Sequence, residues 1–179
     1  MNPEIFESKF IMNEATWQRI ERLVNTEDDI GLVLRVHLIT EAMIEAFCCA
    51  AVGNQNLFDG FGENLTMTYA AKIQLAANLG LNEHSVAELK RLNRIRNVRS
   101  HQIDNPEITD AEIESLRTFI SRGGQEDLIN SARFGIKVGD IELNLNRPDA
   151  NNREKFIAIL GSIILRLTKM DLWLLPGFH

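Results

Sequence analysis

One long apolar segment constrains the fold more than any other feature of the chain. Residues 28–52 read "DDIGLVLRVHLITEAMIEAFCCAAV", which is long enough for about seven helical turns. Two aspartates stand at its start, where the helix dipole favours negative charge, and Gly53 follows its end, where glycine commonly adopts the left-handed cap conformation. Because the segment is apolar on most sides, we predict a central helix that other helices bury.

Shorter helical patterns surround this segment. Trp17 begins an amphipathic spacing near the N-terminus, and Gly80 ends an alanine-rich stretch. Pro106 ends a further helix after His101, because the residue before a proline is pushed out of helical geometry. Thr109 and Glu112 form a capping box that starts the next helix. The predicted helices cover residues 13–25, 65–79, 82–101, 109–122 and 149–174.

A short β element interrupts the helical pattern. In "FGIKVGDIELNLN" apolar residues alternate around Gly139 and Asp140, which is the turn chemistry of a two-residue hairpin. A chain of 179 residues with 45% hydrophobic content can build one continuous core. The sequence therefore predicts a single all-α domain over residues 1–179. We expect a multi-helix bundle of about six helices, with a small β-hairpin at residues 130–147 before the C-terminal helix.

The charge pattern limits the classes of partner. The net charge of −6 argues against a surface made for general phosphate binding. Residues 1–89 carry 5 basic and 13 acidic side chains, whereas residues 90–99 carry five basic side chains and no acid. Any contact with nucleic acid is therefore expected to be local to residues 90–99.

The cysteines and the apolar runs predict a cytoplasmic protein. Cys48 and Cys49 are adjacent, which suits neither a bridge to a distant element nor a metal site. The first ten residues lack the basic start and apolar run of a secretory signal. The longest apolar run, "FIAILGSIIL", has about half the length of a membrane span, so we expect no membrane contact.

The basic stretch lies on the predicted helix over residues 82–101. At about 100° per residue, five polar side chains share one sector: Asn93, Arg96, Asn97, Ser100 and His101. Leu92, Ile95 and Val98 lie opposite and attach the helix to the bundle, while Arg91 and Arg99 flank that side and extend to water. An ordinary solvated helix explains the arginines. Asparagine and serine are poor helix formers, however, and favour a functional surface.

The string "RNVRSH", residues 96–101, resembles the Arg-Asn-three residues-His signature of the HEPN superfamily. These compact helical domains occur in RNA-cutting toxins, antiviral effectors and non-catalytic relatives. Residues 30–122 are similar in order and spacing to the mannitol operon repressor family of that superfamily. The shared pattern is a helix with a central Lys72, a Leu-Gly stop, the helix with Arg and His, and an acidic capped helix. In catalytic relatives the Arg and His line a cleft between two subunits, so the resemblance implies a homodimer.

One function implied by the resemblance is that of a cytoplasmic regulatory or interaction protein that acts through protein partners. Its binding or interface residues would be Asn93, Arg94, Arg99 and Lys72. No helix-turn-helix with a basic recognition helix occurs in the sequence, so we predict no sequence-specific DNA contact.

The alternative is a metal-independent endoribonuclease of the toxin type, so whether the protein is an enzyme stays open. Arg96 would hold the phosphate and His101 would act as base or acid. Asn97 would orient the imidazole or the phosphate, and Ser100 would add a hydrogen bond. Arg96 and His101 diverge by about 140° on a straight helix, so one subunit does not point both side chains at the same phosphorus. A second copy of the motif, or fraying of the helix after Ser100, would bring them together.

A second polar group lies on the central helix. His37, Glu41 and Glu45 share one face at i, i+4 and i+8, a spacing that can hold a metal. With one histidine and no second ligand pair, we expect a polar seam or a partner for Arg96, and we predict no metal and no cofactor. A neighbouring segment either lines the same cleft or forms only a capped helix; its residues are Thr66, Thr68, Tyr69 and Lys72.

Overall fold

The computed structural model describes residues 1–59, 67–101, 107–125, 130 and 134–172. Within them, the predicted all-α bundle with a hairpin before the C-terminal helix is confirmed. The seven α-helices of the described residues are α1 (Pro3–Phe6), α2 (Glu14–Val24), α3 (Asp29–Val52), α4 (Tyr69–Asn78), α5 (Glu83–His101), α6 (Asp110–Ile120) and α8 (Asn152–Leu172). The remaining elements are two π-helical segments, η1 (Glu7–Ile11) and η2 (Ser121–Gln125), and strands β1 (Gly135–Val138) and β2 (Ile141–Asn144).

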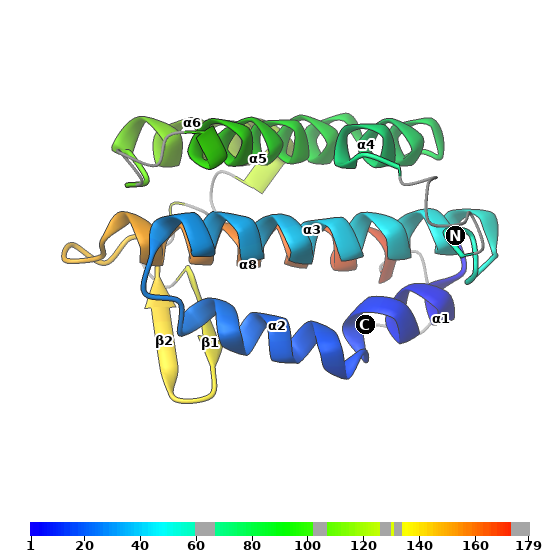
Figure 1. The fold of residues 1–179 in the computed structure, drawn as a ribbon, viewed down its shortest axis with the longest axis horizontal. Helices are drawn as coiled ribbons and strands as arrows, with labels where there is room; N and C mark the ends of the chain where they lie inside the picture. The colour runs from blue at the N-terminus through cyan, green and yellow to red at the C-terminus, as the bar shows by residue number, and fades with distance from the viewer. Residues whose placement is uncertain (60–66, 102–106, 126–129, 131–133, 173–179) are drawn as a thin grey trace.

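The elements form three layers (Figure 1). Helices α4, α5 and α6 make one outer layer, and α1, α2 and the hairpin lie on the opposite side. Helices α3 and α8 run between them, and α3 contacts α2, α4, α5 and α8. The predicted central helix is therefore confirmed. Its most deeply buried side chains are Leu32, Ile39, Met43 and Ile44, each at most 1% exposed.

Local capping explains where the principal helices start and stop. Asp28 caps the start of α3 by accepting from the Gly31 amide, and Gly53 ends the helix with a left-handed φ of 71°. The capping box of Thr109 and Glu112 at the start of α6 is confirmed. No helix among the described residues is both long and apolar enough to cross a bilayer.

Two predicted boundaries differ from the structure, and one helix was not predicted. Helix α4 starts at Tyr69 and not at residue 65, because the Thr68 side chain caps it; residues 60–66 lie outside the described part. Helix α6 ends at Ile120, slightly before the predicted end near residue 122, and the wider turns of η2 begin at Ser121. Gly123 and Gly124 lie within η2. The N-terminal helix α1 is absent from the prediction, although an Asn2 cap and buried phenylalanines fix it.

The hairpin has the predicted two-residue turn. Val138 pairs with Ile141 in the antiparallel register, and Gly139 has φ 58°, which suits glycine as the first turn residue. At the other end of β1, Gly135 lies so close to the backbone of Leu143 that a side chain would overlap the carbonyl oxygen. Helix α8 covers the hairpin from the core side, since it contacts both strands.

Candidate functional site

Helix α5 packs into the core with Leu89, Leu92 and Ile95, which are 0%, 4% and 1% exposed. Val98, predicted to belong to the same apolar side, is 38% exposed, so that part of the prediction is wrong. Val98 is rotated by about 60° from Ile95 around the helix axis, which carries it past the edge of the contact.

The prediction that Arg91 and Arg99 extend to water is also wrong. Arg99 is 4% exposed, and its Nη2 lies 2.5 Å from Oε2 of Glu112 on α6. Arg91 is half-buried and donates from Nε to Ser115 Oγ at 2.5 Å. Both arginines therefore join α5 to α6, and Arg99 forms a buried ion pair within the fold.

The polar sector of α5 opens into a pocket of about 410 Å³. Three of its predicted members, Asn93, Arg96 and Asn97, line this pocket together. The other walls come from the middle of α3 and the start of α4: His37, Glu41, Met67, Thr68, Tyr69 and Ala70. The structure thus brings the motif helix and the polar face of the central helix into one site.

Arg96 supplies the positive charge of the pocket. Its Nη1 donates to Asn97 Oδ1 at 2.9 Å, but its buried Nε has no hydrogen-bond partner in the described part of the chain. Among the described residues, no carboxylate forms an ion pair with it, including Glu41. Of the two expectations for the acids of the central helix, a polar seam or a partner for Arg96, the structure therefore shows the seam, and the guanidinium can donate to an external anion.

His37 of α3 lines the pocket opposite the motif helix α5. It is 8% exposed, and its ring stacks on that of Tyr69 at a centroid distance of 4.0 Å. Burial, followed by the positive charge of Arg96, lowers the pKa of His37, while Glu41 and a hydrogen bond with Asn93 act in the opposite direction. The lowered pKa favours the neutral imidazole, and its buried Nε2 has no hydrogen-bond partner among the described residues.

Lys72 forms ion pairs with Glu41 and Glu45 of α3. Its Nζ lies 2.7 Å from Glu41 and 2.5 Å from Glu45, and the Lys72 side chain is only 12% exposed. Burial acts to lower the pKa of Lys72, but the hydrogen bonds and charges of the two carboxylates together raise it. The predicted polar seam is therefore present, with Lys72 at its centre.

Two of the other predicted residues, Ser100 and Arg94, do not line the pocket. Ser100 is exposed and donates to the Asn97 carbonyl at 3.1 Å, and Arg94 is exposed. His101 is the last residue of α5, and its side chain lies outside the described part. The i, i+4 spacing of His37 with Glu41 predicted a polar face on the central helix, but it did not predict that this face meets Asn93, Arg96 and Asn97.

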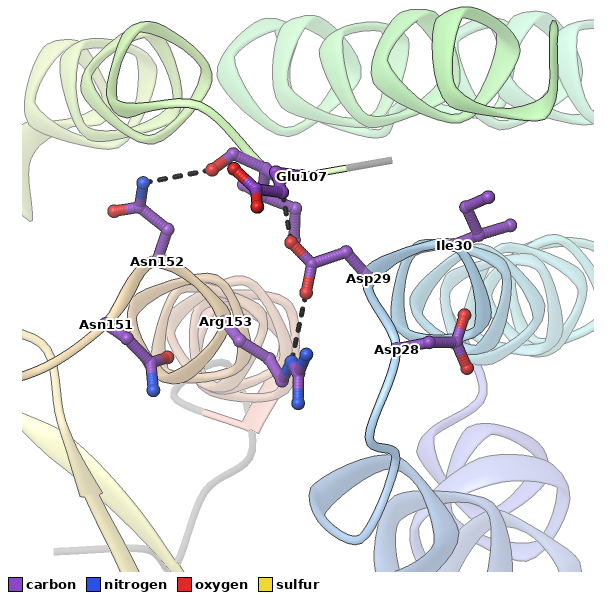
Figure 2. A pocket seen from close by; sticks show the side chains of 8 residues that line it. Asp28, Asp29, Ile30, Glu107, Asn151, Asn152 and Arg153 are labelled. Carbon is purple, nitrogen blue, oxygen red and sulfur yellow. Dashed lines mark hydrogen bonds and ion pairs between the residues drawn. The ribbon is translucent and has the colours of Figure 1, made fainter. Parts of the chain in front are cut away.

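A second, larger pocket of about 610 Å³ lies where α3, α6 and α8 begin (Figure 2). Asp29 accepts from the Ile108 amide at 2.7 Å and from Arg153 Nε at 3.0 Å, and Asn152 donates to the Ile108 carbonyl at 3.0 Å. These polar groups hold three chain segments together, so we assign them a structural role. In the part of the chain that the structure describes, no group of three or more His, Cys, Asp or Glu side chains could hold a metal.

Comparison of the chain with protein-family models, with curated proteins and with solved structures found no match in any of the three. The candidate function therefore rests on the pocket beside Arg96 and on the motif of α5.

Proposed function

We propose that the protein is a regulatory or interaction protein of the mannitol operon repressor-like type, which acts as a dimer and through protein partners. The supporting observation is the Arg96 pocket, where a guanidinium without a carboxylate partner lies beside two amides and a neutral imidazole. These groups suit the binding of an anionic or acceptor group from another chain.

Exposed leucines extend the same surface. Leu34 is 38% and Leu38 is 54% exposed, and they share a face of α3 with Glu41 at i, i+4 and i+7. Apolar side chains beside an oriented cation are typical of protein interfaces, where aliphatic contact supplies area and arginine supplies direction. We assign this surface to the dimer or partner contact.

A metal-independent endoribonuclease is the second candidate, and one observation favours it. Arg96 and His37 line one pocket, and within the part of the chain that the structure describes the Nε of Arg96 and the Nε2 of His37 have no hydrogen-bond partner. In this reading a base takes the 2′-hydroxyl proton and the 2′-oxygen attacks phosphorus. The bond to the 5′-oxygen breaks, and that oxygen takes up a proton from the protonated base or from water. The products are a 2′,3′-cyclic phosphate and a 5′-hydroxyl end, with Arg96 on the phosphate and His101 or His37 as the base.

One experiment separates the two functions. Cells that express the wild type, Arg96→Ala, His101→Ala or the control Arg19→Ala, at an exposed arginine of α2, are compared by transcript abundance and by mapping of 5′-hydroxyl RNA ends. A regulator changes the abundance of a limited set of transcripts in an Arg96-dependent way and creates no new 5′-hydroxyl ends. New ends that disappear in Arg96→Ala and His101→Ala contradict the regulator and support the nuclease.

Purified protein provides the second arm. The regulator neither cuts mixed RNA in EDTA nor shifts an operator DNA fragment alone at physiological salt. Light scattering after gel filtration is expected to show a dimer that Leu38→Glu disrupts. A monomeric wild type at micromolar concentration contradicts the dimer.

A further inference from the structure

A groove of about 530 Å³ lies between α2 and the turn of the hairpin, in the layer opposite to α5 (Figure 1). Its lining comes from two segments far apart in the sequence, one face of α2 and residues 138–141. The apolar part of the lining consists of Trp17, Val24, Val138 and Ile141.

Trp17 is the main apolar group of the groove. It belongs to the amphipathic spacing of its helix, yet it is 55% exposed. Its indole Nε1 donates to the Ile11 carbonyl at 2.7 Å, which orients the ring and satisfies its polar atom. The exposed remainder of the side chain is therefore an apolar, oriented surface, the kind that anchors protein interfaces.

The polar part of the groove is acidic. Glu14, Glu21 and Asp140 line it, and none of the lining residues is basic. Glu14 accepts a hydrogen bond from neutral Gln18 at 3.1 Å, and none of the three carboxylates has an ion-pair partner in the described part of the chain. Three uncompensated carboxylates beside an exposed tryptophan repel phosphates and attract lysine or arginine, which also binds favourably over an indole ring.

We propose that this groove docks a cationic amphipathic segment of a partner protein, in which lysine or arginine side chains alternate with aliphatic ones. The aliphatic side chains cover Trp17, Val24 and Ile141, while the cations meet the carboxylates at the rim. This proposal goes beyond the function proposed above. The groove and the Arg96 pocket lie in opposite layers, so either site can fail its test without the other.

The test uses a fluorescent peptide of alternating blocks of lysine and leucine, titrated by anisotropy against the full chain at physiological salt. Two control peptides replace lysine with glutamate or scramble the order of the same residues. Trp17→Ala is expected to weaken binding about tenfold, which is the scale of an interface hot spot. Glu21→Gln is expected to weaken binding several-fold and to reduce its salt dependence.

Matched controls decide whether binding occurs in the groove. Glu83→Gln removes a 90% exposed carboxylate of α5, in the opposite layer, and is expected to leave the affinity unchanged. If Trp17→Ala fails to fold, Trp17→Phe replaces it as the test variant, because it keeps an aromatic group. In NMR spectra of the wild type, the Gly139 amide signal is expected to shift when the peptide binds. Three results overturn the proposal. They are equal weakening of binding by Glu83→Gln and Glu21→Gln, equal affinity for the scrambled peptide, and no binding at millimolar peptide. Self-association of the chain that Trp17→Ala abolishes also overturns it, because the occupant is then a second copy.

Discussion

Replacing Glu112 by glutamine tests the pair that ties the motif helix to the bundle. The Glu112 carboxylate accepts from Arg99 at 2.5 Å and from the amide and hydroxyl of Thr109 at 2.9 and 3.0 Å. The side chains of Arg99 and Glu112 are 5% and 11% exposed, so the substitution leaves a buried guanidinium without its carboxylate. Removing one partner of a buried ion pair costs about 3–5 kcal/mol, and the residual exposure of Glu112 favours the lower end.

The assay is urea denaturation followed by circular dichroism. A loss of about 3 kcal/mol corresponds to a fall in Tm of about 6–12 °C, at roughly 2–4 °C per kcal/mol for a chain of this size. Thr109→Ala removes only the cap and is expected to cost about 1 kcal/mol. The double variant Arg99→Met with Glu112→Leu is expected to recover most of the loss, because an apolar pair of similar volume often replaces a buried ion pair without cost. If Glu112→Gln costs no more than Thr109→Ala, the ion pair contributes nothing to the attachment of α5.

Three further predictions concern other buried groups. Because the pKa of His37 is lowered in the folded state, the unfolded chain binds the proton first as pH falls. The free energy of unfolding therefore decreases as pH drops from 6.5 through the lower folded-state pKa. His37→Gln is expected to flatten this pH dependence in urea titrations at several pH values, whereas the control His84→Gln, at a 45% exposed side chain, is expected to leave it unchanged. Burial raises the pKa of Cys48 to about 12, so iodoacetamide at neutral pH is expected to modify this thiol only after the chain unfolds. Mass spectrometry measures the modification, and rapid modification of the native chain would contradict the burial of Cys48. Gly135→Ala places a methyl group against the Leu143 carbonyl and is expected to cost about 1–3 kcal/mol in the same denaturation assay, and an unchanged midpoint contradicts the close approach.

The site was only partly predictable. The sector of Asn93, Arg96 and Asn97 follows from helical periodicity, and the structure places all three in one pocket. The opposite wall, with His37, does not follow from it, because periodicity shows which residues share a face and not which helix that face meets. The same limit explains Arg99, whose position beside Leu92 gave no sign of a carboxylate on the following helix.

The sequence by itself determined the hairpin, the helices other than α1, and most of the ends of those helices. Those features depend on residues a few positions apart, as in the capping box of Thr109 and the glycine turn at Gly139. The tertiary structure alone decided that Lys72 forms ion pairs with acids 27 and 31 residues away, and that Trp17 faces an acidic groove. The physical reason is that each of these environments comes from a segment distant in the chain, and local propensity contains no information about which distant segments pack together.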